Sequence, residues 1–176
     1  IDILINNAGG GVAIRDTVDL TDEDIDRALD LNLKSVIYGS RAFAPMMMRQ
    51  KRGTIVNISS VCAKQAWPQW TLYASAKWGV LGLTKTLAKE VGSKGIIVNA
   101  LCPTKVKTPM CETQSYVEFI NELTGKNFKD YKEMYAGVPF LDVEDISDMV
   151  YWLGTSRAAG KFNGRDVALD LGTLQC

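Results

Sequence analysis

Residues 54–60 read TIVNISS and join a buried type of strand to two hydroxyl side chains. Residues 54–58 are mostly apolar and rich in β-branched side chains, which is typical of a strand covered on both faces of a parallel sheet. Ser59 and Ser60 follow directly, so they would lie at the carboxyl edge of such a sheet. Open α/β proteins bind their ligands at that edge. The stretch therefore predicts a central strand that presents a hydroxyl to a ligand.

Strand-like and helix-like segments alternate on both sides of this stretch. Thr21 and Asp24 are spaced like a capping box before a helical segment, and the glycines of GSKG, residues 92–95, close another one. Such alternation predicts a parallel sheet with helices on both faces. The expected fold is α/β, with a Rossmann-like doubly wound parallel sheet in a single domain, residues 1–176. The expected strands are residues 1–5, 54–58, 96–101 and 166–172, and the expected helices are 22–50, 72–91 and 143–155, with short helices within 112–137.

The charge balance narrows the classes of function. Lys plus Arg and Asp plus Glu each number 20, so no net charge attracts the protein to nucleic acid or to an anionic membrane. The apolar runs are too short to span a membrane, and the start shows no basic segment followed by an apolar one. We therefore expect a cytoplasmic protein with a small-molecule or protein partner.

Histidine is absent from the sequence, and cysteine is sparse. Without histidine, Ser-His-Asp and Cys-His catalysis and His-ligated metal sites are excluded, so Tyr, Lys, Asp or Glu must carry any acid–base chemistry. The cysteines lack CxxC spacing, which predicts no metal site and reduced, partly buried thiols. They are Cys62, Cys102, Cys111 and Cys176.

Tyr73 and Lys77 are four positions apart in YASAK, so on a helix they would be neighbours. A free tyrosine has a pKa of ~10, and lowering it by about 3 units needs roughly 4 kcal/mol. An ammonium at ~5 Å supplies about 3 kcal/mol at an effective dielectric of ~20. A tyrosine packed beside a lysine is also common on helix surfaces. Ser60, thirteen positions before Tyr73, favours the catalytic interpretation because its hydroxyl can hold a substrate oxygen.

In these residues the sequence resembles the short-chain dehydrogenase/reductase family. The resemblance covers essentially the whole chain, and it implies an NAD(P)-dependent oxidoreductase that transfers hydride between a nicotinamide cofactor and a secondary alcohol or ketone. The motifs follow the family's order and spacing: NNAG at residues 6–9, Asn32 within LNLKSV, Ser60 within NISSV, YASAK at 73–77 and VNALCPTKVKTPM at 98–110.

The resemblance assigns roles to the acid–base residues. Tyr73 would be the catalytic acid or base, and Lys77 would lower its pKa and bind the nicotinamide ribose. Ser60 would hold the substrate oxygen, with Ser59 as the rival for this role; the separation of thirteen residues favours Ser60. Asn32 would bind a water molecule in a proton relay to Lys77, although a lone asparagine within a helix can also be a tolerated polar residue.

Two segments would bind the cofactor by the same resemblance. The turn after the first strand has small residues that permit close approach of the backbone, and it would also end that strand. The loop after residues 96–101 would hold the nicotinamide carboxamide. There the usual Pro-Gly is Pro103-Thr104, which is similar to a branch of terpene-alcohol, carveol-like dehydrogenases. The residues matched to the family are Asn7, Ala8 and Gly9 in the turn and Pro103, Val106 and Thr108 in the loop.

The family's glycine-rich phosphate-binding turn is missing from the sequence. The GGG at residues 9–11 cannot replace it, because no helix opens directly after it. The N-terminal βαβαβ portion of the fold is therefore expected to be absent and the chain to be a fragment, with an exposed apolar edge at residues 1–5. The cofactor is expected to be NAD or NADP, with NAD preferred, although the residue that discriminates between them would lie in the missing portion.

A largely apolar pocket is expected, suited to a terpenoid- or steroid-like alcohol or ketone. Several of its aromatics could equally be ordinary core residues. The expected wall comprises Trp67, Trp70, Trp78, Met110 and the aromatics of residues 116–135, with few charges beyond Lys105 and Lys107.

Other functions stay open at this point. The fold without its dinucleotide half could serve as a catalytically silent binding or assembly module, and dehydratase or epimerase chemistry would use the same tyrosine and lysine. By resemblance, the helices at 22–50 and 72–91 would also form the subunit interface of a homodimer or homotetramer.

Overall fold

A parallel β-sheet lies at the centre of the structure, a computed structural model in which residues 1–174 are described. Over those residues the strand order is β1-β2-β3-β4, and each neighbouring pair is parallel. β2 and β3 are central and largely buried, which explains their continuous apolar sequence. The predicted α/β class and parallel sheet are confirmed. The strands are β1 (Ile3–Asn6), β2 (Gly53–Ile58), β3 (Ile96–Pro103) and β4 (Asp166–Leu169).

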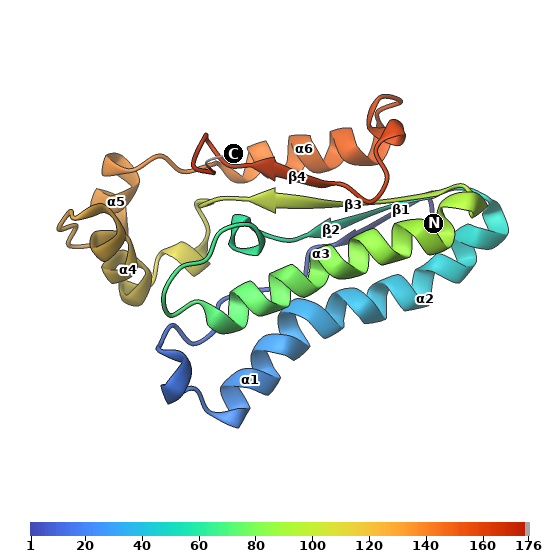
Figure 1. The fold of residues 1–176 in the computed structure, drawn as a ribbon. Helices are drawn as coiled ribbons and strands as arrows, with labels where there is room; N and C mark the ends of the chain where they lie inside the picture. Colours follow the sequence, from blue (N-terminus) through green and yellow to red (C-terminus); the bar gives the residue numbers. More distant parts are fainter. Residues whose placement is uncertain (175–176) are drawn as a thin grey trace.

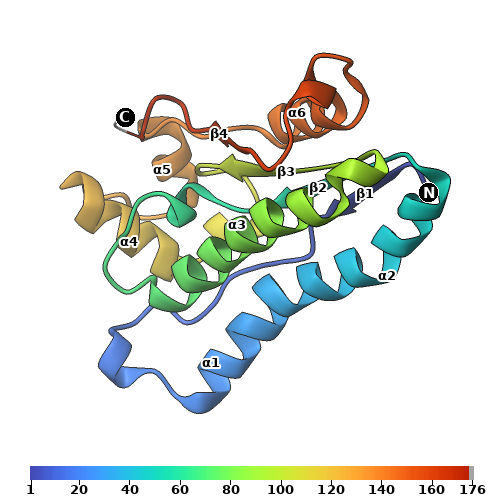
Figure 2. The ribbon, with the colours of Figure 1, turned by 45° about the vertical axis from the view of Figure 1, so that its right-hand side comes forward.

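Helices cover both faces of the sheet (Figure 1). In both views α2 and α3 run side by side on one face, and α6 lies on the other (Figure 2). The first face packs around Met47 and Ile55, and the second around Val56 and Leu153. Ile55 and Val56 are consecutive in β2 and serve opposite faces, as alternation along a strand requires. The longer helices are α1 (Asp22–Leu29), α2 (Ser35–Gln50), α3 (Thr71–Val91) and α6 (Val143–Thr155).

Two further helices, α4 and α5, lie beyond the carboxyl ends of β3 and β4 (Figure 1). They occupy the polar segment for which short helices were predicted. Their bounds are Gln114–Thr124 for α4 and Tyr131–Gly137 for α5. Single 3-10 turns complete the described elements: Thr17–Asp19, Val61–Ala63, Gly92–Lys94, Pro109–Cys111 and Ala159–Lys161.

The predicted helix at 22–50 is interrupted by a π-helical turn at Asp30–Lys34. It begins as expected, because Thr21 and Asp24 form a capping box in which each side chain accepts the backbone N–H of the other residue, at 3.1 Å. Within the turn, the buried Asn32 donates its side-chain amide to the carbonyl of Ala28 (3.2 Å). Such side-chain bonds compete with regular helical bonding. The prediction of one continuous α-helix is therefore wrong in its middle.

The last strand is shorter than predicted. It ends at Leu169 rather than at residue 172. Leu171 and Gly172 have φ angles of 53° and 72°, so the chain turns in the left-handed region and cannot continue the extended pairing. A run of β-forming residues alone did not reveal this turn.

β1 lies at an edge of the described sheet and exposes apolar side chains. Ile1, Ile3 and Ile5 are all exposed, in agreement with the predicted apolar edge. Edge strands of this kind offer unpaired backbone groups to another strand.

The described part of the chain contains three of the four cysteines and all the helices that could be considered as membrane spans. Cys62, Cys102 and Cys111 are buried and unpaired, as predicted, whereas Cys176 lies outside the described residues. Among residues 1–174, no helix has the length and apolar character needed to cross a membrane.

Candidate active site

A cavity of about 730 Å³ opens at the carboxyl ends of the strands. Its floor comes from three neighbouring strands, because Asn7 follows β1, Ser60 follows β2 and Pro103 ends β3. Tyr116 and Phe119 contribute from α4. The predicted site residues that line it are Asn7, Gly9, Ser60, Tyr73, Lys77, Pro103, Val106 and Thr108.

Tyr73 and Ser60 are brought together within this cavity. Tyr73 lies in the first turn of α3, and Ser60 is the N-cap of the turn Val61–Ala63, where its Oγ accepts the N–H of Cys62 at 3.1 Å. Burial raises the pKa of Tyr73 well above its ordinary value, and nearby Cys62 adds to this, whereas a hydrogen bond with Ser60 lowers the pKa in part. The phenol is therefore held in its protonated form beside a second hydroxyl.

The neighbouring Ser59 makes a different contact. Its hydroxyl donates to the backbone carbonyl of Lys77 at 2.9 Å, so it ties the end of β2 to α3. Of the two serines, Ser60 is the one that contacts the phenol of Tyr73. This geometry favours Ser60 as the residue that holds a substrate oxygen.

Lys77 lies beside Tyr73, as the i,i+4 spacing predicts. Its Nζ is 5.4 Å from the centre of the Tyr73 ring and donates to the carbonyl of Ile58 at 2.9 Å. Burial lowers the pKa of Lys77 to about 8, because the ammonium is poorly solvated. The expected net lowering of the Tyr73 pKa is not found, since desolvation of the phenol outweighs its neighbours.

Asn32 joins the site from behind the cavity wall. Its Oδ1 accepts the backbone N–H of Gly10 at 3.0 Å. A Cβ placed on Gly9 would lie 3.0 Å from that oxygen and 3.3 Å from the Lys77 Nζ, so a side chain at this position would crowd both groups. Asn32 thus holds the turn after β1 against Lys77. The predicted water-binding role of Asn32 stays a prediction.

The residues around the cavity fit the cofactor that the resemblance implies. Asn7, Gly9 and Gly10 leave one wall of the cavity without large side chains, whereas Ala8 does not line it. Of the described residues that line the cavity, Lys77 and Lys105 are cationic and none is acidic. The wall therefore accommodates a flat ring and attracts an anionic dinucleotide.

The loop after β3 is fastened to the sheet despite its unusual Pro103-Thr104 pair. The N–H of Thr104 donates to the carbonyl of Leu169 at 2.9 Å, which extends the pairing of β3 with β4. Val106 forms a bridge with Leu141. These bonds give the loop a defined path without the glycine that the family pattern would place there.

Aromatic rings form the apolar wall of the cavity. The Trp70 ring meets Tyr73 edge-on at 5.5 Å between centroids, Tyr116 edge-on at 6.0 Å and Phe119 at 5.1 Å. Trp67 and Met110 also line the cavity, as predicted. The aromatics of α5 pack in the same cluster without lining the cavity.

Trp78, Lys107 and Phe128 were also predicted around the pocket, and they too lie outside its lining. Trp78 is 55% exposed and does not line the cavity. It is five positions beyond Tyr73, and at about 100° a residue this places it on another side of α3. Lys107 pairs with Asp142 at 2.8 Å, outside the cavity lining.

Some lining residues were not singled out by the sequence. Cys62 and Cys111 both line the cavity, and neither the contact of Cys62 with Ser60 nor that of the Cys111 thiol with the Tyr116 hydroxyl follows from a local sequence pattern. Ile146 and Ser147 of α6 also line the cavity, and only the packing of α6 shows this.

The chain is similar to known dehydrogenases and reductases. The family model described as short chain dehydrogenase matches residues 1–117. A 3-oxoacyl-[acyl-carrier-protein] reductase of Synechocystis sp. is 34% identical over 176 residues, which cover 99% of this chain and 65% of that protein. Carveol dehydrogenase from Mycobacterium avium in complex with NAD has a TM-score of 0.85 at 31% identity, covering 97% of this chain and 64% of its own.

A structure of ElxO with NADP bound has a TM-score of 0.78 at 26% identity, covering 96% of this chain and 65% of that one. The chain therefore spans 64% to 65% of the length of these relatives.

Proposed function

The chain belongs to the short-chain dehydrogenase family, and from this we propose that the full-length protein is an NAD- or NADP-dependent oxidoreductase that interconverts a secondary alcohol and a ketone. The observation that supports this most is the grouping of Tyr73, Ser60 and Lys77 in one cavity. The relatives with bound NAD and NADP support a nicotinamide cofactor.

Tyr73 is the proposed proton donor and acceptor. When bound, the nicotinamide ring supplies or accepts the hydride. Tyr73 gives its phenolic proton to the ketone oxygen during reduction and takes it back during oxidation. Because burial raises the pKa of Tyr73, the phenol carries its proton at neutral pH and is prepared for reduction.

Lys77 supports this proton transfer. With a pKa lowered to about 8, it is mainly charged at pH 7, yet it exchanges a proton readily near neutrality. Its ammonium stabilises negative charge that develops on Tyr73 and would bind the cofactor ribose. Asn32, through Gly10, keeps the neighbouring turn in place.

Ser60 is the proposed partner of the substrate oxygen. Its hydroxyl shares the Tyr73 hydrogen bond and would stabilise the alkoxide-like oxygen of the transition state. Asn7, Gly9, Pro103, Val106 and Thr108 would border the nicotinamide half of the cofactor.

A largely apolar ketone or alcohol, terpenoid- or steroid-like, is the proposed substrate. The cavity lies within the range of roughly 300–1,000 Å³ typical of ligand pockets. Its aromatic wall of Trp70, Tyr116 and Phe119 favours a rigid apolar skeleton. Likeness to carveol dehydrogenase supports this choice, whereas likeness to the 3-oxoacyl reductase makes an acyl thioester the alternative.

The experiment is a cofactor-oxidation assay on the full-length protein with carvone and with acetoacetyl-CoA, using NADH and NADPH separately. We expect Tyr73-dependent reduction of carvone or a related cyclic ketone. If Tyr73→Phe left the rate with an accepted ketone unchanged, tyrosine acid–base catalysis would be ruled out. Preference for the thioester would move the substrate proposal to the acyl class.

A silent binding module is the rival function, and nucleotide binding separates it from the enzyme. NADH fluorescence should rise when the full-length protein is added. No change with either reduced cofactor would favour the module.

A homodimer or homotetramer is also proposed, with α2 and α3 at the interface. The exposed Tyr38 of α2 and Trp78 of α3 leave aromatic surface on these two helices. Light scattering of the full-length protein measures the mass, and a monomer would overturn the proposal.

A further inference from the structure

Ser60 and Tyr73 must stay in register although they come from different elements. On the strand side of Ser60, two hydrogen bonds fasten the chain to α3: Ser59 donates to the carbonyl of Lys77, and the Lys77 ammonium donates to the carbonyl of Ile58, both at 2.9 Å. These bonds fix only one side of the serine.

The other side is fastened through Lys64. Its backbone N–H closes the turn Val61–Ala63 by donating to the carbonyl of Val61 at 2.8 Å. Its ammonium makes a short contact with the carboxylate of Asp166, at the start of β4. Asp166 thereby anchors the far end of the turn that Ser60 begins.

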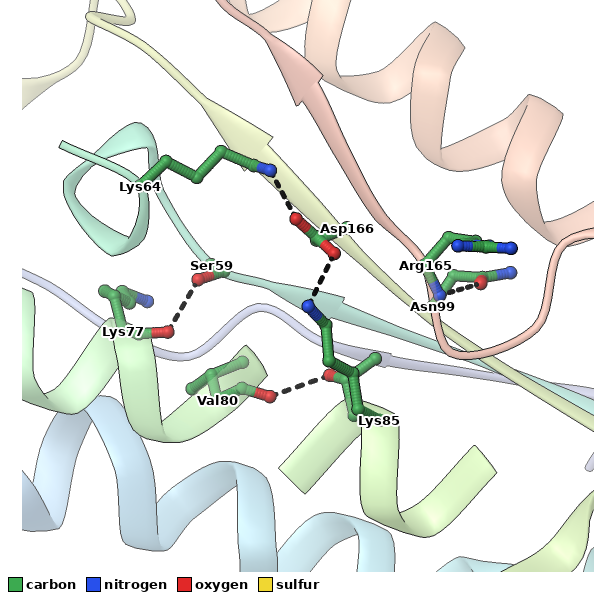
Figure 3. Close-up of polar contacts among 9 residues, drawn as sticks. Ser59, Lys64, Lys77, Val80, Lys85, Asn99, Arg165 and Asp166 are labelled. Atoms are coloured by element: carbon green, nitrogen blue, oxygen red, sulfur yellow. Dashed lines mark hydrogen bonds and ion pairs between the residues drawn. The ribbon is translucent and has the colours of Figure 1, made fainter. Parts of the chain in front are cut away.

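Asp166 also binds α3. Its other oxygen lies 3.1 Å from the Nζ of Lys85. Figure 3 shows the side chains of Lys64 and Lys85 converging on Asp166 from the two sides, with the Ser59 contact to Lys77 nearby. These contacts form a closed chain. They connect the turn that Ser60 begins (the serine turn) to β4, β4 to α3, which carries Tyr73, and α3 back to the residue before Ser60.

The carboxylate is well placed to hold both arms. The side chain of Asp166 is 19% exposed and that of Lys64 26%, against 55% for Lys85, so the arm to the serine turn is the better shielded from water. Burial raises the pKa of Asp166, but the hydrogen bonds and the positive charges of the two lysines together outweigh it, and the net pKa is lowered. Partly buried, charge-assisted bonds of this kind are stronger than exposed ion pairs.

We infer that Asp166 is a positioning residue, which sets the placement of Ser60 against Tyr73 by holding Lys64 and Lys85 at once. The inference deepens the proposed function and, for its catalytic consequence, rests on it. Asp166 lines no part of the cavity and touches no reacting atom, so it acts only through the serine turn.

Hydrogen exchange tests the anchoring without any assay of activity. In the turn, the amides of Ala63, Lys64 and Gln65 donate to Ser60 or Val61 carbonyls at 2.8 to 3.0 Å. Asp166→Asn leaves two ammonium groups facing a neutral amide, and we expect about tenfold faster exchange of these amides in the full-length protein. Asp2→Asn is the matched control, because it removes an exposed ion pair to Arg52 of 3.1 Å far from the cavity.

Kinetics test the catalytic consequence on the same variants. For Asp166→Asn we expect kcat for an accepted ketone to fall about tenfold with the Kd for NADH unchanged, and Asp166→Glu to restore part of it. If Asp166→Asn fails to fold, Lys64→Gln breaks only the arm to the serine turn and should give the same pattern.

The outcomes are distinct. Unchanged exchange in the 63–65 amides, or equal changes in Asp166→Asn and Asp2→Asn, would overturn the anchoring. Faster exchange with unchanged kcat would overturn the positioning role. If the wild-type protein turned over no ketone, the proposed function would be wrong. The exchange rates of the 63–65 amides would still show whether Asp166 anchors the turn Val61–Ala63.

Discussion

Tyr73 of α3 and Tyr116 of α4 line the same cavity, and both are buried, yet their surroundings differ. Burial raises the pKa of each phenol. Tyr73 has the Ser60 hydroxyl and the Lys77 ammonium beside it, whereas the hydroxyl of Tyr116 contacts the thiol of Cys111. The comparison teaches that burial makes either phenol a weaker acid, and that the two tyrosines differ in their neighbours, because of the two it is Tyr73 that has a hydroxyl and an ammonium beside it.

Removal of the Tyr73 hydroxyl should have the largest effect. Tyr73→Phe keeps the ring against Trp70 but leaves no group to donate the proton, so we expect kcat to fall by roughly 10³-fold. Steady-state kinetics of ketone reduction measure it, with the NADH Kd as the control that should not move. A loss below about tenfold would remove the distinction between the two tyrosines.

The buried ammonium of Lys77 should appear in the pH dependence of stability. Its folded pKa of about 8 is below the value of 10.5 for the exposed group, so the folded state loses the proton first as pH rises. Stability should therefore increase between pH 8 and 10.5, by roughly 3 kcal/mol relative to Lys77→Met. Urea unfolding of both proteins at pH 7.5 and pH 10 measures the difference. If the free energy of unfolding changed equally with pH in the wild type and in Lys77→Met, the Lys77 ammonium would be solvated in the folded protein rather than buried beside Tyr73.

The hydroxyl partner of Tyr73 should matter next. Ser60→Ala removes it while leaving Ser59 bonded to the carbonyl of Lys77, and we expect kcat to fall by about 10²-fold. Ser59→Ala is the matched control: it should lower the free energy of unfolding, because it removes the bond to the Lys77 carbonyl, and should change kcat little. If the two variants exchanged these effects, Ser59 would be the residue that holds the substrate oxygen.

The smallest effect is expected at Tyr116. Tyr116→Phe removes only the contact with Cys111 and keeps the packing on Trp70 and Phe119, so kcat should change less than about threefold. KM for an apolar ketone should change by a similar factor. A loss of kcat comparable to that of Tyr73→Phe would show that both phenols transfer protons.

Much of the framework could be predicted because local signals agree with the fold. The bounds of α6 match the predicted residues 143–155, and TIVNI and IIVNAL lie in β2 and β3. Spacing of four along a helix also placed Lys77 beside Tyr73. These features depend on contacts between residues close in sequence or on a continuous apolar pattern.

Features that depend on distant residues could not be predicted. The raised pKa of Tyr73 could not be predicted from the spacing of Tyr73 and Lys77, because desolvation of a buried phenol depends on the whole cavity wall. Asp166 meets Lys64 across 102 positions of sequence, and no local pattern indicates this pair. Helix periodicity shows that Trp78 and Tyr73 lie on different sides of α3. It does not show which of these sides faces the cavity, and in the structure Trp78 is exposed.

The π-helical turn at Asp30–Lys34 lies between α1 and α2, so its length sets how far α1 is rotated about the helix axis relative to α2. Each residue advances an α-helix by about 100°, so one residue more or less in this turn rotates everything before it by that angle. Deletion of Leu33 or Lys34, which lie between Asn32 and α2, would therefore rotate Asn32 away from Gly10 without altering either side chain. The bond that holds the turn after β1 thus depends on the number of residues in the π-helical turn as well as on the asparagine side chain at position 32.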